Sequence, residues 1–209
     1  MNFYNSAVPG YQIKQHKENL KKFIYFKEVH KVIYFFTLND VYDLSNLIKQ
    51  KEDIIQKDKK EPKELKIKNF INSFLRNKSY LYMYLKGITS DPSKRWYQNI
   101  DSFYASKDIS LTSNYFKELK IFSEKYNAEL YVVILPYEYQ TRSCKSDDFK
   151  PQAKISKILF NNKIKFFDFS KDFCNHTNPK KYFYKFDPAH FSVLGHKLIY
   201  KLINEKINL

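Results

Sequence analysis

Short apolar runs alternate with amphipathic stretches along the chain. The clearest runs are KVIYFFT at residues 31–37 and LYVVIL at residues 130–135, both continuous and rich in β-branched and aromatic residues. A shorter run covers residues 165–169, and residues 3–8 read as the end of a further strand. Continuous apolar runs of this length are typical of strands buried on both faces of a parallel sheet. The pattern therefore predicts an α/β protein with a mostly parallel sheet.

Helices are expected around these strands. Apolar residues recur at helical spacing over residues 12–26, 111–126 and about 192–207, which indicates helices with one buried face. Thr112 and Ser113 are the expected N-caps of the second helix, because short hydroxyl side chains accept a bond from a free backbone N–H.

The middle of the chain, about residues 42–110, is the least regular part. We expect a solvated mixed-charge stretch over residues 49–68, a helix over residues 69–86 and a loop over residues 91–104. No linker separates two halves. The prediction is a single domain over residues 1–209 with a helical insert at about 42–110.

Composition excludes several classes of function. The chain has only three glycines, at positions 10, 87 and 195, whereas a phosphate-binding loop or a dinucleotide fingerprint needs several in one turn. The formal net charge of +15 allows a basic patch for nucleic acid or an anionic polymer. The lysines are spread along the chain between acidic residues and accompany no nucleic-acid motif. We therefore expect no cofactor and no specific nucleic-acid partner.

The cysteines and the apolar runs bear on the compartment. Cys144 and Cys174 have no metal-ligand spacing, so no metal site is expected. Two free thiols in a reducing compartment are a simpler expectation than a disulfide. The longest apolar stretch, residues 32–38, is too short to cross a bilayer. No secretory signal opens the sequence, which favours a cytoplasmic location.

Candidate chemistry follows the strands, because ligands of an open parallel sheet bind beyond the carboxyl ends of its strands. Asp187 and His190 lie three residues apart in a loop before the last helix. That spacing lets the carboxylate orient the imidazole and stabilise its protonated form, as in a Ser-His-Asp arrangement. A capping aspartate beside a surface histidine produces the same spacing.

Two further residues are candidate donors to an oxyanion. Gly10 offers a backbone N–H without a side chain beside it, and Asn39 offers an amide at a strand end. Each has a structural alternative: a turn with positive φ for Gly10, and a cap of the next helix for Asn39.

The order of these blocks resembles the SGNH (GDSL-type) ester hydrolase superfamily. NSAVPGY resembles the family's glycine block, TLND its asparagine block, and DPAHFSVLGH its aspartate–histidine block. The resemblance implies a flavodoxin-like three-layer sandwich and an ester hydrolase or acyl transferase. It assigns catalytic roles to His190 and Asp187 and an oxyanion hole to Gly10 and Asn39. Carbohydrate O-acyl groups are the favoured substrate, because aromatic residues are plentiful.

The chain departs from the family at its start. The serine block should lie some thirty to forty residues before Gly10, and no serine of the sequence has the setting of a nucleophile. The implied fold also lacks its first central strand. A truncated product carrying the remaining site is one reading, which we favour. The alternative is a non-catalytic SGNH-like domain that binds a glycan or a protein.

Overall fold

The computed structural model describes residues 3–24, 28–41, 74, 79–81, 91–106, 109–185 and 187–207. The chain divides into two compact units, one formed by residues 1–41 and 93–209 and the other by residues 42–92. The expected mixed-charge stretch and most of the expected helix over 69–86 lie outside the described residues. The first unit carries the sheet and all of the site described below.

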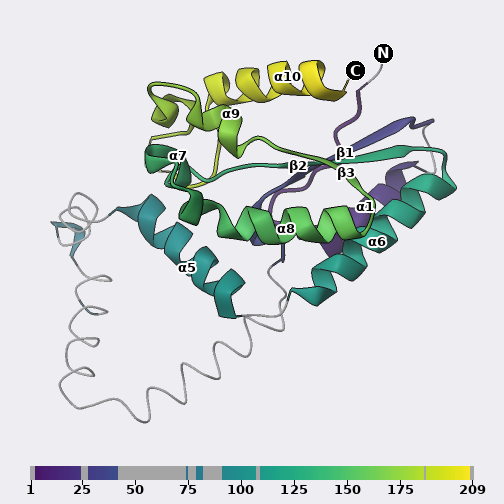
Figure 1. Cartoon of the computed structure of the whole chain (residues 1–209), viewed down its shortest axis with the longest axis horizontal. Coiled ribbons are helices and arrows are strands. Elements are labelled where there is room, and N and C mark those ends of the chain that lie inside the picture. Colours follow the sequence, from purple (N-terminus) through teal and green to yellow (C-terminus); the bar gives the residue numbers. More distant parts are fainter. Residues whose placement is uncertain are drawn as a thin grey trace, which may run out of the picture. The chain divides into compact units, whose positions relative to one another are not determined.

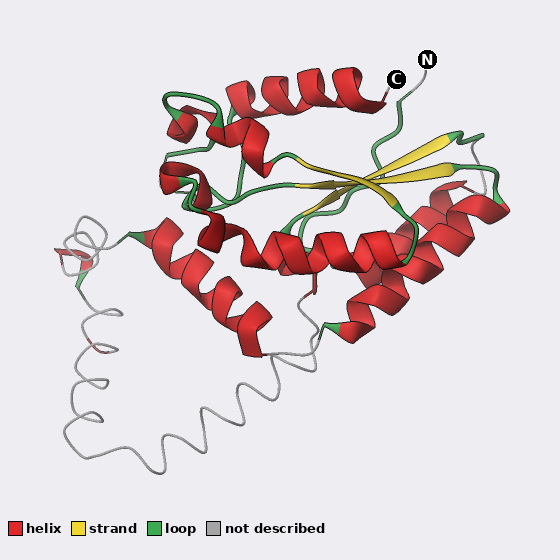
Figure 2. Cartoon of the chain, viewed as in Figure 1, coloured by secondary structure: helices red, strands yellow, loops and turns green. Residues whose placement is uncertain are grey.

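The sheet has three parallel strands in the order β1-β2-β3, which confirms the α/β class (Figures 1 and 2). The strands are β1 (Lys31–Phe36), β2 (Glu129–Ile134) and β3 (Lys165–Asp168). Lys31 lies opposite Glu129, and Tyr131 lies opposite Lys165. All three lie within one residue of the apolar runs that predicted them. Only the central strand β2 is buried on both faces, whereas Phe35 of β1 is exposed and β3 is half-buried.

Helices cover both faces of this sheet. In Figure 1, α10 (Val193–Ile207) lies on one face, while α1 (Ile13–Ile24), α6 (Ser110–Lys125) and α8 (Lys150–Asn161) lie on the other. The core under α10 joins side chains of β2 to the helix and to the segments that precede it. Its members include Tyr131, Val133, Leu135, Phe169, Phe173, Phe191, Ile199 and Leu202.

Short helices follow the strands. They are η1 (Leu38–Val41) after β1, α7 (Gln140–Ser143) and η2 (Ser146–Phe149) after β2, and α9 (Ser170–Cys174) and η3 (Pro179–Tyr182) after β3. They bring polar residues to the carboxyl ends of the strands, the edge at which open sheets bind ligands.

The expectation of a strand over residues 3–8 is wrong. These residues form no ladder with a described strand. The Tyr4 ring instead contacts Phe23 of α1, and the Asn19 amide donates to the Ser6 carbonyl. An extended segment forms a strand only where a neighbour accepts its backbone hydrogen bonds, so its sequence pattern alone did not decide the outcome.

The expectation of a loop over residues 91–104 is also wrong. The structure has α5 (Pro92–Ser106) there, with a proline near its start where helices tolerate one. Tyr97, Ile100 and Tyr104 are buried at spacings of three and four residues. Helix α6 lies where expected, although Ile109 is its N-cap and no side chain caps it, contrary to the expectation for Thr112 or Ser113.

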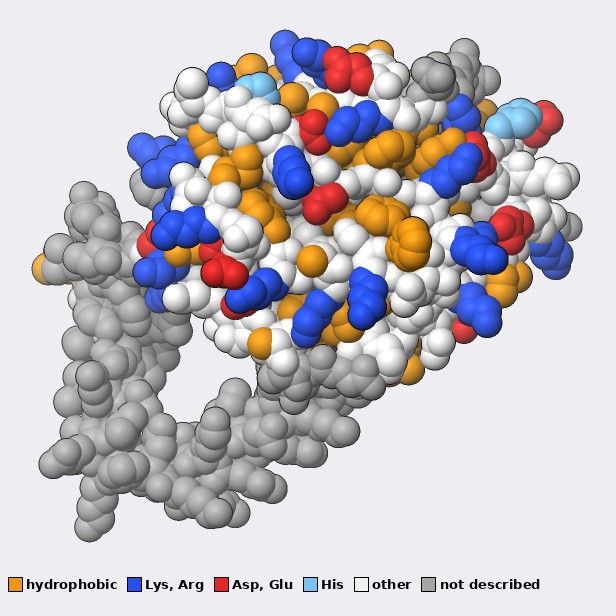
Figure 3. Space-filling model, viewed as in Figure 1, with side chains coloured by type: hydrophobic (Ala, Val, Ile, Leu, Met, Phe, Trp, Pro, Cys, Tyr) orange, Lys and Arg blue, Asp and Glu red, His pale blue; other side chains and the backbone are white. Residues whose placement is uncertain are grey.

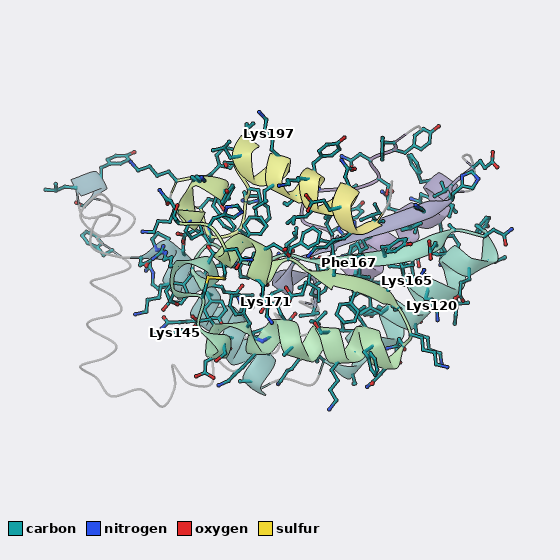
Figure 4. All side chains as sticks on the ribbon, turned by 45° about the horizontal axis from the view of Figure 1, so that its top comes forward. Lys120, Lys145, Lys165, Phe167, Lys171 and Lys197 are labelled. Atoms are coloured by element: carbon teal, nitrogen blue, oxygen red, sulfur yellow. A yellow bond between two sulfur atoms is a disulfide. The ribbon has the colours of Figure 1, made fainter. Side chains whose placement is uncertain are left out.

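The expectation of two free thiols is wrong as well. Cys144, which ends α7, and Cys174, which ends α9, form a disulfide with a Cα–Cα distance of 5.8 Å. Lys145 and Lys171, labelled in Figure 4, lie on the two segments that the bond joins. Because β2 and β3 are neighbours, the segments that follow them meet at one edge of the sheet. The disulfide therefore links the segments after β2 and β3 at the edge of the sheet where the candidate site lies.

Candidate active site at the carboxyl ends of the strands

Asp187 and His190 form the pair that their spacing predicts. The His190 Nδ1 lies 3.0 Å from Oδ1 and 2.9 Å from Oδ2 of Asp187. The His190 side chain is 79% exposed, and no described residue bonds to its Nε2. The imidazole is thus oriented through one nitrogen and presents the other to solvent, the arrangement of a general base.

The loop holds the Asp187 carboxylate in its charged form. Partial burial alone would raise the pKa of Asp187. The backbone N–H groups of Ala189 and His190 donate to Oδ1 at 2.9 Å each, and together with the His190 ring they lower that pKa below its ordinary value. An ionised partner is what a histidine base needs when it takes up a proton.

A backbone bond fixes this loop to the end of β2. The Glu138 N–H donates to the Pro188 carbonyl at 3.0 Å. Glu138 is buried, and its carboxylate pairs with Arg142 at 2.6 Å on the next helical turn. The bond of the buried Glu138 carboxylate to the partly exposed Arg142 therefore helps to position the backbone that carries the Asp187–His190 loop.

Asn39 reaches the same strand end from β1. Its Oδ1 accepts from the Tyr137 hydroxyl at 2.7 Å and lies 2.9 Å from the Thr37 hydroxyl, and its backbone N–H donates to the Tyr137 oxygen at 3.1 Å. The Thr37 hydroxyl has a single hydrogen and also lies 3.0 Å from Asp40 Oδ1, so the Tyr137 hydroxyl is the donor that fixes Asn39 Oδ1. No described residue accepts from the Asn39 amide NH₂. Asn39 thus bonds to Tyr137, and the loop that carries His190 bonds to Glu138. Because Tyr137 and Glu138 are consecutive, both parts of the candidate site are fixed to the same point after β2.

The Asp40 carboxylate is buried and bonds to residues at the end of β1. Its Oδ2 accepts from the Tyr34 hydroxyl at 2.9 Å and from the Thr37 N–H at 3.0 Å. Burial raises the pKa of Asp40 to about 6, and these hydrogen bonds only partly oppose the rise. The carboxyl holds the turn in which Asn39 lies.

Gly10 lies in a turn that precedes α1. It is exposed with φ +80° in a turn closed by the Tyr11 N–H and the Val8 carbonyl at 3.2 Å. No hydrogen bond or ring contact between described residues links it to Asn39 or His190. Its structural role is the turn, since glycine adopts positive φ without a Cβ clash.

The described serines near the strand ends hold structural positions. The Ser192 hydroxyl donates to the Lys181 carbonyl at 2.7 Å and accepts from the Gly195 N–H at 3.3 Å, which makes it the cap of α10. The Ser170 hydroxyl is buried and has no partner among the described residues. No described serine hydroxyl bonds to the His190 ring.

Sequence reasoning passed over three residues that support this site: Tyr137, Glu138 and Arg142. A signal for the ion pair was present, because a glutamate and an arginine four residues apart face each other on one helical turn. Tyr137 gave no local signal, since its partner lies on another strand. Among the described residues, no group of three or more histidine, cysteine or acidic side chains is arranged to hold a metal ion.

Comparison with known proteins yields no match, whether with family models, curated proteins or solved structures. In the described part of the chain, no helix combines the length and apolar character needed to span a membrane. The features that bear on function are therefore the sequence blocks and the geometry of Asp187, His190 and Asn39.

Proposed function

We propose that this chain carries the base and the oxyanion-binding part of an SGNH-type ester hydrolase or acyl transferase, acting on O-acylated carbohydrate. The observation that carries the proposal is the Asp187–His190 pair, with both carboxylate oxygens within 3.0 Å of Nδ1 and an exposed Nε2. In acyl transfer, Nε2 accepts the proton of the attacking hydroxyl as its oxygen bonds to the ester carbonyl.

The Asn39 amide is the proposed donor to the carbonyl oxygen. Tyr137 donates to its Oδ1 and accepts from its backbone N–H, so the NH₂ is oriented before any ligand binds. An oriented donor stabilises developing negative charge without reorganising, which is why such donors contribute strongly to acyl transfer. Gly10 remains a proposed second donor, on the resemblance alone.

The attacking hydroxyl is not assigned to any of the described serines, because none of their hydroxyls bonds to the His190 ring. Ser192 caps α10, Ser143 donates to Asp148, and Ser170 is buried. The proposal therefore concerns the protein as its native source produces it. The first measurement is the intact mass and N-terminal residue of that product, together with its activity on 4-nitrophenyl acetate and acetylated oligosaccharides.

His190→Ala should lower kcat/KM for 4-nitrophenyl acetate by about 100-fold or more, the usual contribution of a general base. His30→Ala is the matched control, since His30 is also exposed but precedes β1 at the opposite ends of the strands. Equal activity of the two variants would refute the assignment. A folded protein without turnover that binds the oligosaccharide would instead support the second function, a glycan-binding domain.

A further inference from the structure

A groove of about 700 Å³ runs along the outer edge of β1. Its floor includes Ile33 and Phe35 of β1. One wall comes from α1 and the other from α10, which lie on opposite faces of the sheet (Figure 1), and Phe3, Tyr4 and Ser6 of the N-terminal segment also line the groove. The wall residues that matter here are Leu20 and Phe23 of α1 and Tyr200 and Ile203 of α10. Phe35 is 41% exposed and Tyr200 63% exposed, so the groove presents large apolar side chains to solvent.

The floor also holds backbone groups without a partner in the described part of the chain. The carbonyls of His30 and Phe36 accept from β2 at 2.8 and 3.0 Å, so even-numbered residues of β1 direct their backbone groups toward β2. Successive residues of a strand alternate sides. Ile33 and Phe35 therefore direct their N–H and C=O groups into the groove, where the described residues supply no neighbouring strand.

These two features define the chemistry of the occupant. A hydrocarbon chain would contact the walls but leave the backbone groups of Ile33 and Phe35 without hydrogen bonds, which is costly once water is displaced. An extended peptide satisfies those groups, and its alternating side chains meet both walls. Because both walls are apolar, the peptide must be apolar on both faces.

A second copy of this chain fits less well. Among the described strands, the edges of its sheet are β1 and β3. Strand β1 carries α1 and α10, the same two helices that form the walls here, and β3 packs against α8 and, through Phe167, against the core under α10. The groove between α1 and α10 has room for a single extended strand, but not for the edge of a sheet that has helices packed on both faces.

We propose that the open edge of β1 binds an extended, doubly apolar segment of another polypeptide, which adds a fourth strand to the sheet. The proposal is independent of the acyl-transfer function, because the groove and its test involve neither His190 nor Asn39. A suitable probe is a synthetic peptide with the sequence of residues 129–135, ELYVVIL, flanked by lysines for solubility. Strand β2 has this composition and already pairs with the other edge of β1.

The test follows amide hydrogen exchange of β1 with and without the peptide. In the chain alone, the Ile33 and Phe35 amides should exchange rapidly while the Val133 amide, inside the β1–β2 ladder, is protected. Saturating peptide should slow exchange at Ile33 and Phe35 at least tenfold. A peptide with alternate backbone N-methyl groups retains its side chains but cannot pair, so it should bind at least tenfold more weakly.

Phe35→Lys should weaken peptide binding at least tenfold, whereas Phe160→Lys, an equally apolar exchange at an exposed site on α8, should leave it unchanged. Equal binding of the methylated peptide would mean an apolar ligand site and would overturn the proposal. So would protection of the Ile33 and Phe35 amides in the chain alone, because the groove would then be filled by the chain itself or by a second copy. Unchanged exchange in saturating peptide would also refute it.

Discussion

At the scale of single residues, Gly195 is unusual because glycine forms helices poorly and yet lies inside α10. Its surroundings explain why. A Cβ at this position would lie 2.1 Å from the Tyr182 carbonyl oxygen and 2.9 Å from the Phe191 Cβ. Glycine in a helix costs about 1 kcal/mol relative to alanine, so close approach of α10 to the preceding segment explains its presence. That approach sets the position of the loop that carries His190.

Gly195→Ala should lower the free energy of unfolding by about 2–3 kcal/mol, since overpacking against backbone outweighs the gain in helix propensity. Urea unfolding measures the change. Leu194→Ala, at a half-exposed neighbouring position, is the matched control and should change stability by about 0.5 kcal/mol or less. A stabilised Gly195→Ala protein would mean that α10 does not approach Tyr182 this closely.

Asp40 predicts a pH dependence of stability. Its pKa rises from 3.8 to about 6 on folding, so the stability linked to its neutral form is fully present below pH 3.8 and is lost as pH rises through about 6. A shift of about two units corresponds to about 3 kcal/mol. Asp40→Asn should remove this loss.

The measurement is the difference in unfolding free energy between Asp40→Asn and the unmodified protein. That difference should shift in favour of the variant by about 3 kcal/mol between pH 4 and pH 8. Asp147→Asn, at an exposed carboxyl on η2, is the matched control for the substitution itself. A constant difference across this range would show that Asp40 titrates normally.

At the scale of elements, the disulfide joins the helices that follow β2 and β3. It closes a loop of 30 residues, and a cross-link over that length stabilises a fold by roughly 3–4 kcal/mol through the entropy of the unfolded chain. The bond also favours an oxidising compartment, because disulfides are rare in the cytosol. The cysteines therefore weigh against the cytoplasmic location expected from the sequence.

Replacement of both cysteines by serine should lower the unfolding free energy by roughly 3–4 kcal/mol. Reductant should destabilise the unmodified protein to a similar extent and leave the double variant unchanged. Alkylation of the denatured, unreduced protein provides the direct check. Two reactive thiols in protein from the native source would contradict the bond.

At the scale of the whole molecule, the net charge of +15 is not gathered in one place on the face shown in Figure 3. Lysines and arginines alternate there with acidic and apolar side chains. The lysines labelled in Figure 4 likewise lie on separate elements, including Lys120 on α6, Lys165 on β3 and Lys197 on α10. Such a distribution favours weak, unspecific attraction to polyanions.

Binding to random-sequence DNA should therefore fall steeply with salt, by about tenfold or more between 50 and 150 mM NaCl, because it depends on counterion release. A fluorescence titration across that range measures the slope. Affinity that persists at 150 mM and differs between sequences would instead indicate a specific nucleic-acid site.

The amino-acid sequence by itself determined the features that depend on near neighbours. The three strands, α1, α6 and α10 follow from the periodicity of apolar residues, and the Asp187–His190 pair follows from a spacing of three. Helix α5 also had a readable pattern in Tyr97, Ile100 and Tyr104, although a loop was expected there. Local geometry suffices for such features because their partners lie within one or two turns.

Only the tertiary structure decided the features whose partners are distant in sequence. The Asn39–Tyr137 bond spans 98 residues, the disulfide joins helices after different strands, and the Glu138–Pro188 bond fixes the histidine loop to β2. The segment 3–8 has strand-like sequence but forms no hydrogen-bonded ladder with a described strand. Backbone and side-chain hydrogen bonds need a partner in space, and the topology of the sheet, rather than the local pattern, supplies or withholds that partner.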